Sequence, residues 1–75
     1  MNKEILTETE KKLWIELLKY YQDNGYMPLR IELARLLSTK SKKISPQLIQ
    51  YWLRGLEAKG WIELHSLKKR GIKLV

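Results

Sequence analysis

Residues 45–60, SPQLIQYWLRGLEAKG, predict one capped helix whose two faces differ in chemistry. Ser45 is a residue type that accepts a hydrogen bond from the free backbone N–H groups of a first turn, and Pro46 suits the first helical position. Gly60 can adopt the left-handed conformation that ends a helix. We therefore expect a helix over residues 46–59.

The two faces of this helix follow from residue spacing. The residues that recur at helical spacing and should face a core are Ile49, Trp52, Leu53 and Leu56. The opposite stripe is polar or aromatic and consists of Gln47, Gln50, Tyr51 and Arg54. Gln and Arg pair two-pronged with the edges of adenine and guanine in the major groove of DNA. The pattern is typical of a recognition helix.

The residues before this helix predict two more helices. Thr7 and Glu10 fit a capping box that opens the first helix, and residues 24–25, NG, end it. Residues 26–28, YMP, should be extended, because the residue before proline avoids helical angles. A second helix is expected over residues 29–37, although Leu29 cannot cap it with a side-chain oxygen. The apolar residues expected to pack from it are Ile31, Leu33, Ala34, Leu36 and Leu37.

The residues after this helix predict a β-hairpin. Residues 61–65 and 71–75 alternate in hydrophobicity, so Ile62, Leu64, Ile72 and Leu74 should point inward. The basic turn between them, residues 66–71, would be the tip of a wing. With the polar turn over residues 38–44, the order is that of a winged helix-turn-helix, which is mainly α with a small hairpin. We expect residues 1–75 to form this single domain.

Charge and composition narrow the range of functions that the sequence suggests. Residues 1–37 carry six basic and six acidic side chains, whereas residues 38–75 carry nine basic side chains and two acidic ones, so the second half supplies the whole net charge of +7. That asymmetry points to a polyanionic partner, although lysines also serve simply to keep small proteins in solution. The chain has no cysteine, no membrane-length apolar run and no apolar block like that of a signal peptide, so a cytoplasmic protein is expected. No glycine-rich phosphate loop, cysteine nucleophile or ligand cluster suggests an enzyme, a cofactor or a metal site.

Several short motifs, in order and spacing, resemble the N-terminal DNA-binding domain of LexA-type repressors. They are residues 6–7 (LT), 25–28 (GYMP), 32–34 (ELA), 45–46 (SP), 59–60 (KG), 62–63 (IE) and 70–74 (RGIKL). The resemblance implies a winged helix-turn-helix, binding to an operator in double-stranded DNA, and a repressor. The family's C-terminal domain, which resembles a self-cleaving serine–lysine peptidase and supplies dimerisation, has no counterpart in this sequence, so we expect a monomer in free solution.

The resemblance also suggests which residues meet DNA. By position the family's base-reading residues fall on Ser45, Gln47, Leu48, Gln50 and Tyr51. Only the serine is shared, so the operator should differ from the usual one. The residues expected at the DNA backbone are Lys40, Lys42, Lys43, Arg54, Lys68, Lys69 and Arg70. The turn that holds the first three is longer than in the family, and a solvated loop is the alternative interpretation of those lysines.

Two functions remain open from the sequence. The first is a sequence-specific regulator of transcription, acting in the bacterial, archaeal or viral host nucleoid, with a second copy on DNA or a partner regulator protein as further partners. The second is a winged helix that binds protein and modulates a repressor or replication complex, which the apolar Leu48 and Leu67 favour. Affinity for duplex DNA that falls as the salt concentration rises would support the DNA-binding function, because this dependence shows that basic side chains neutralise phosphates.

Overall fold

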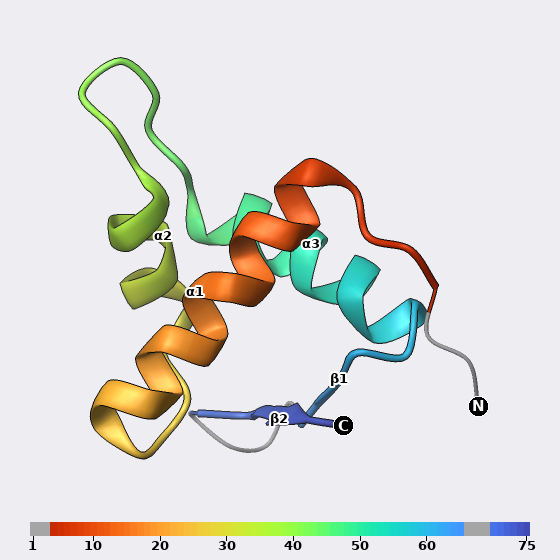
Figure 1. Cartoon of the computed structure of the whole chain (residues 1–75). Helices are drawn as coiled ribbons and strands as arrows, with labels where there is room; N and C mark the ends of the chain where they lie inside the picture. Colours follow the sequence, from red (N-terminus) through yellow and green to blue (C-terminus); the bar gives the residue numbers. More distant parts are fainter. Residues whose placement is uncertain (1–3, 66–69) are drawn as a thin grey trace.

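Three helices and a two-stranded sheet make up the part of the chain that the computed structural model describes, residues 4–65 and 70–75. The elements in chain order are α1 (Glu8–Asn24), α2 (Arg30–Leu37), α3 (Pro46–Ala58), β1 (Ile62–Leu64) and β2 (Ile72–Leu74). Figure 1 shows α1 lying across α3, with α2 on one side and the small sheet below. This arrangement is a winged helix-turn-helix and confirms the predicted fold.

The ends of α1 follow the predicted local chemistry. The hydroxyl of Thr7 accepts a hydrogen bond from the backbone N–H of Glu10 at 3.2 Å, and the Glu10 carboxylate accepts one from the N–H of Thr7 at 2.9 Å. Gly25 has a φ of 77° and donates its N–H to the carbonyl of Tyr21 at 2.8 Å. Each end of the helix therefore has one of its free backbone groups satisfied by a neighbouring residue, the N–H of Glu10 at the start and the carbonyl of Tyr21 at the end.

The start of α2 is stabilised by a carboxylate three residues further along the chain. Leu29 precedes the helix and supplies no side-chain cap, as expected, but the Glu32 carboxylate accepts its backbone N–H at 2.7 Å. Leu33 and Ala34 are buried, whereas Ile31 and Leu36 are 48% and 52% exposed. The prediction that Ile31 and Leu36 pack inward was wrong, because a helix of two turns buries only one narrow stripe.

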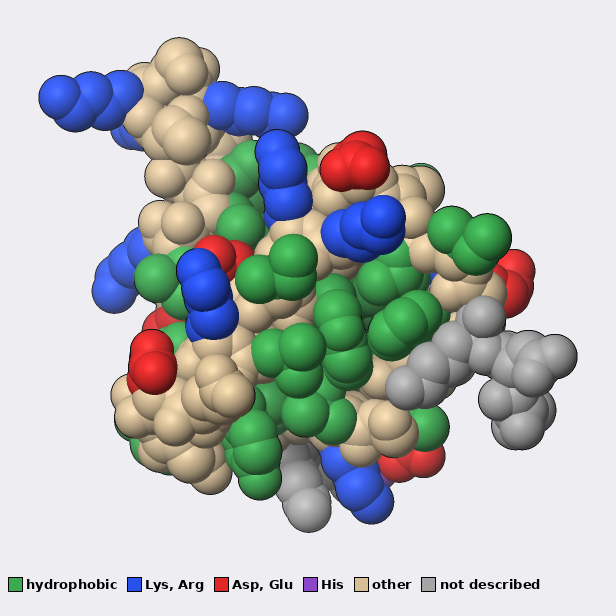
Figure 2. All heavy atoms as spheres, in the orientation of Figure 1, with side chains coloured by type: hydrophobic (Ala, Val, Ile, Leu, Met, Phe, Trp, Pro, Cys, Tyr) green, Lys and Arg blue, Asp and Glu red, His purple; other side chains and the backbone are tan. Residues whose placement is uncertain are grey.

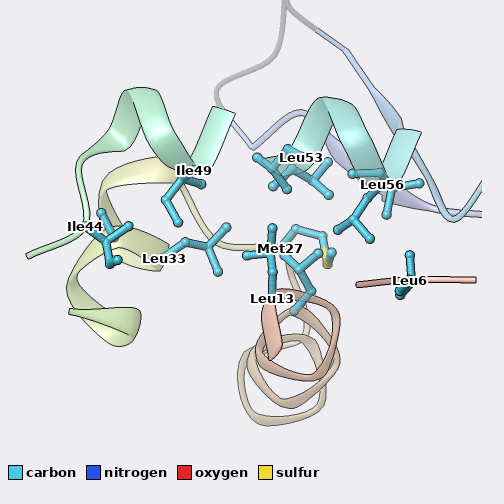
Figure 3. Packing of buried hydrophobic residues seen from close by; sticks show 12 residues of the cluster. Leu6, Leu13, Met27, Leu33, Ile44, Ile49, Leu53 and Leu56 are labelled. Carbon is cyan, nitrogen blue, oxygen red and sulfur yellow. The ribbon is translucent and has the colours of Figure 1, made fainter. Parts of the chain in front are cut away.

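The core lies where the three helices meet the hairpin. Leu13 and Leu17 of α1 are fully buried, as are Leu33 of α2 and Ile49, Leu53 and Leu56 of α3. Trp52, which was also predicted to face the core, is half-buried and packs against it. Figure 3 shows Leu53 and Leu56 on the side of α3 that faces Leu13 and Met27, and Ile49 next to Leu33 of α2. The opposite side of α3 is therefore the side that remains available to a partner.

The hairpin closes one end of this core. β1 and β2 pair antiparallel, with Ile62 opposite Leu74 and Leu64 opposite Ile72. Ile62 and Ile72 are buried, while Leu64 and Leu74 are half-buried against the core, so the predicted inward alternation is confirmed. No helix among residues 4–65 and 70–75 has the length and apolar character to cross a membrane.

Candidate nucleic-acid interface

The exposed stripe of α3 carries three of the side chains that the sequence singled out. Gln47, Tyr51 and Arg54 are all exposed, and Tyr51 is 72% exposed. Ile49, Leu53 and Leu56 of the same helix are buried, so the three exposed side chains belong to its opposite side. An amide, a phenol and a guanidinium thus stand together on one accessible helix face, where hydrogen-bonding groups can reach base edges.

The first turn of α3 uses two of the predicted base-reading residues for its own structure. The hydroxyl of Ser45 accepts a hydrogen bond from the backbone N–H of Leu48 at 3.1 Å, which caps the helix. The Leu48 side chain is half-buried and packs against the core. Contact of either residue with a base stays a prediction.

Gln50 is half-buried and has a partner on another helix. Arg30, in the first turn of α2, donates a hydrogen bond from Nε to the side-chain oxygen Oε1 of Gln50. Arg30 and Gln50 line a shallow groove together with Arg54, Glu57 and Leu64. The sequence analysis did not predict a role for Arg30, which it counted only among the balanced charges of residues 1–37. Arg30 lies twenty positions from Gln50, so no local pattern links the two residues.

The turn before α3 projects from the body of the protein (Figure 1). The hydroxyl of Ser38 accepts the backbone N–H of Ile44 at 2.8 Å, which closes the base of the turn. Nearer the tip, the N–H of Thr39 donates to the carbonyl of Lys42 at 2.7 Å. The predicted backbone-contact residues on it, which are Lys40, Lys42 and Lys43, are all exposed. Figure 2 shows basic side chains extending from both sides of this projection.

The wing is only partly described. Leu67, Lys68 and Lys69 lie outside the described residues, so their predicted contacts stay predictions. Arg70 follows directly and is engaged within the protein: its Nη1 donates to Oε1 of Glu32 at 2.8 Å and to the carbonyl of Met27 at 2.9 Å. Contact of Arg70 with DNA stays a prediction, and the structure gives this residue a second role that holds the wing against α2.

The Arg70 network perturbs the ionisation of its carboxylate. The hydrogen bond from Arg70, followed by the one from the backbone N–H of Leu29, lowers the pKa of Glu32 from an ordinary value of 4.5 to about 2. The guanidinium also lies over the ring of Tyr26, with Cζ 4.4 Å from the ring centroid. This cluster ties the hairpin turn just before β2 to the start of α2.

Internal ion pairs reduce the basic surface that the sequence suggested. Lys59 pairs with Glu10 at 2.5 Å between Nζ and Oε1, so that one basic residue of the second half meets an acid of the first. Arg70 and Glu32 make a second such pair. Of the residues predicted to contact the DNA backbone, those that remain exposed in the described part are Lys40, Lys42, Lys43 and Arg54. Exposed positive charge is therefore densest on the projecting turn, and Arg54 is the one basic residue of α3.

The fold and the exposed polar stripe beside a basic turn define a winged helix-turn-helix domain. No family model matches the chain. Among curated proteins, it is 36% identical over 70 residues to the LexA repressor of Alcanivorax borkumensis, and 35% identical over 72 residues to that of Desulfatibacillum aliphaticivorans. It is 29% identical over 75 residues to the LexA repressor of Carboxydothermus hydrogenoformans.

These alignments cover nearly all of the chain but little of each relative. They include 93%, 96% and 100% of this chain against 32%, 34% and 35% of the respective repressors. The chain therefore spans about a third of the length of the curated relatives it matches. It resembles the N-terminal DNA-binding part of LexA repressors, which confirms the resemblance found in its sequence.

Proposed function

We propose that this chain is a sequence-specific regulator of transcription that binds double-stranded DNA and acts as a repressor. The observation that carries the proposal is the exposed stripe of Gln47, Tyr51 and Arg54 on α3, in a chain similar to LexA repressors. In this proposal residues 1–75 act as one DNA-binding domain and perform no catalysis.

The proposed mode of binding places α3 in the major groove. Gln47 and Tyr51 would meet base edges, and Arg54, two turns into the helix, would meet phosphate. Lys40, Lys42 and Lys43 lie on the turn that leads into α3, where the DNA backbone would pass, and the wing would rest on the backbone or enter the minor groove.

A selection experiment tests sequence reading. The full chain is incubated with a random duplex pool, and bound sequences are recovered and compared with those selected by Gln47→Ala. Loss of the Gln47 amide should flatten base preference at one or two positions, by about 1–3 kcal/mol each. Gln22→Ala, an exposed glutamine on α1, is the matched control and should select the parent sequence. Identical selection by Gln47→Ala would contradict the assigned reading face.

A salt titration tests phosphate contact. Lys42→Ala should weaken binding to all duplexes alike and reduce the slope of log affinity against log salt by about one. Lys19→Ala removes an exposed lysine from α1 and should leave the slope unchanged. If the parent chain binds no duplex, or binds without salt dependence, the proposal fails in favour of a protein-binding winged helix.

A further inference from the structure

The pairing of Arg30 with Gln50 bears on which base α3 can read. An arginine side chain has only hydrogen-bond donors, so its partner on a glutamine must be the amide oxygen. Arg30 Nε donates to Oε1 of Gln50, and this contact fixes which end of the amide faces α2. The amide NH₂ of Gln50 is left as the end that can serve a partner from outside.

The other polar groups of this groove reinforce that bias. Arg54 stands one turn after Gln50 on α3 and supplies donors only. Glu57 is the acidic residue that lines the same groove, but its Oε2 accepts the backbone N–H of Leu64 at 2.9 Å. One of its two carboxylate oxygens is thus engaged by the end of β1, which leaves it a single acceptor oxygen at this groove. The face formed by Arg30, Gln50 and Arg54 is rich in donors.

A donor-rich face suits one base above the others. A glutamine reads adenine with both ends of its amide, since the oxygen accepts from N6 and the NH₂ donates to N7. Guanine presents two acceptors, N7 and O6, in the major groove. We propose that Arg30 is a specificity-determining residue, which orients the Gln50 amide so that α3 reads guanine rather than adenine at this position.

This inference rests on the proposed DNA-binding function and adds a residue outside the recognition helix to it. Arg30 acts through Gln50 and is therefore a positioning residue. Its removal frees the amide oxygen and lets the amide rotate to a two-pronged pairing with adenine. The base chosen at one position of the site should change, while the positions read by Gln47 keep their preference.

The test compares four proteins by selection from a random duplex pool: the parent, Arg30→Ala, Gln50→Ala and Arg35→Ala. The position at which Gln50→Ala loses its preference is the position that Gln50 reads. There the parent should prefer guanine over adenine by about tenfold, and Arg30→Ala should lose or invert that ratio. Arg35 is an exposed arginine of the same helix, so Arg35→Ala removes the same charge and should select the parent sequence.

A second measurement uses the free protein. The side-chain amide signals of Gln50 in an NMR spectrum should shift in Arg30→Ala and stay in place in Arg35→Ala, which checks the contact without DNA. The inference is overturned if Arg30→Ala keeps guanine at the Gln50 position. It is equally overturned if Arg30→Ala weakens all duplexes alike and lowers the salt slope, because Arg30 is then a phosphate contact. Absence of salt-dependent binding by the parent defeats the proposed function itself, and this inference with it.

Discussion

Arg70 donates a hydrogen bond to Glu32 at 2.8 Å, which joins the loop of the hairpin to the first turn of α2. The same carboxylate accepts the backbone N–H of Leu29 and so stabilises the start of that helix. One glutamate therefore sets both the start of α2 and the position of the wing relative to it. Since α2 packs against α3, this contact also links the hairpin to α3 through α2.

The lowered pKa of Glu32 predicts a loss of stability in acid. The group titrates at about 2 when folded and near its ordinary 4.5 when unfolded, so between these values the unfolded state binds more protons. The stabilisation is complete above about pH 4.5 and is lost as the pH falls toward 2. Thermal unfolding from pH 6 to pH 2 should show this decline, and Glu32→Gln should show a shallower one. Some decline should remain in Glu32→Gln, because the pKa of Glu10 is also lowered, mainly by its hydrogen bond from Lys59, and Glu10 therefore also loses stabilising contacts in acid. Parallel curves for parent and variant would contradict the assignment.

Removal of the Arg70 guanidinium should loosen the hairpin more than the core. Arg70→Ala deletes the donor of the hydrogen bonds to Glu32 and to the carbonyl of Met27. Amide hydrogen exchange should become faster at His65, whose N–H donates to the carbonyl of Gly71 at 2.7 Å, while Leu53 in α3 keeps its protection. Lys73→Ala removes an exposed cation from the same hairpin and serves as the control. Equal exchange in both variants would show that Arg70 does not hold the wing.

The crossing of α1 over α3 predicts an unusual response at Gly55. A Cβ at this position would lie 2.6 Å from Oε2 of Glu10, whose other oxygen is held by Thr7 and Lys59. Replacement of a helical glycine by alanine ordinarily stabilises by about 1 kcal/mol. We expect Gly55→Ala to bring no gain in the parent but about 0.5–1 kcal/mol in a Glu10→Ala background. Urea denaturation of the four proteins measures this coupling, and the same effect in both backgrounds would disprove the clash.

The buried face of α3 should dominate the stability of the protein. Leu53 is fully buried, so Leu53→Ala should cost about 2–5 kcal/mol in free energy of unfolding. Leu36 is 52% exposed, and the same substitution there should cost less than about 1 kcal/mol. Urea unfolding followed by circular dichroism compares the two variants. Similar costs would mean that α3 does not pack as described.

The role of Ser45 as a helix cap can be tested separately from its predicted contact with a base. Ser45→Ala removes the acceptor for the N–H of Leu48 and should lower stability by about 1 kcal/mol. Ser45→Asp supplies another capping oxygen and should recover most of that stability, while its negative charge weakens binding to DNA. Thermal unfolding and duplex titration of both variants give the two readouts. Unchanged stability in Ser45→Ala would remove the capping role.

Local sequence was sufficient to predict most of the helices and strands. The Thr7–Glu10 capping box, the cap and proline at 45–46, and the glycine at position 25 were predicted and are present, because each depends on residues within one turn of the chain. The core-facing residues of α3 and the alternation of the hairpin were also confirmed, since burial follows helical and strand periodicity. The short α2 was the exception, because its pattern offered more apolar residues than two turns can bury.

The sequence by itself determined three helices, a hairpin, a polar stripe on α3 and the likeness to LexA repressors. Only the tertiary structure decided which charges remain at the surface. Glu32 meets Arg70 from 38 positions away, and Glu10 meets Lys59 from 49 positions away. Arg30 likewise reaches Gln50 from a different helix. Such pairs depend on how packed elements bring distant backbones together, whereas periodicity and capping report only on neighbours along the chain.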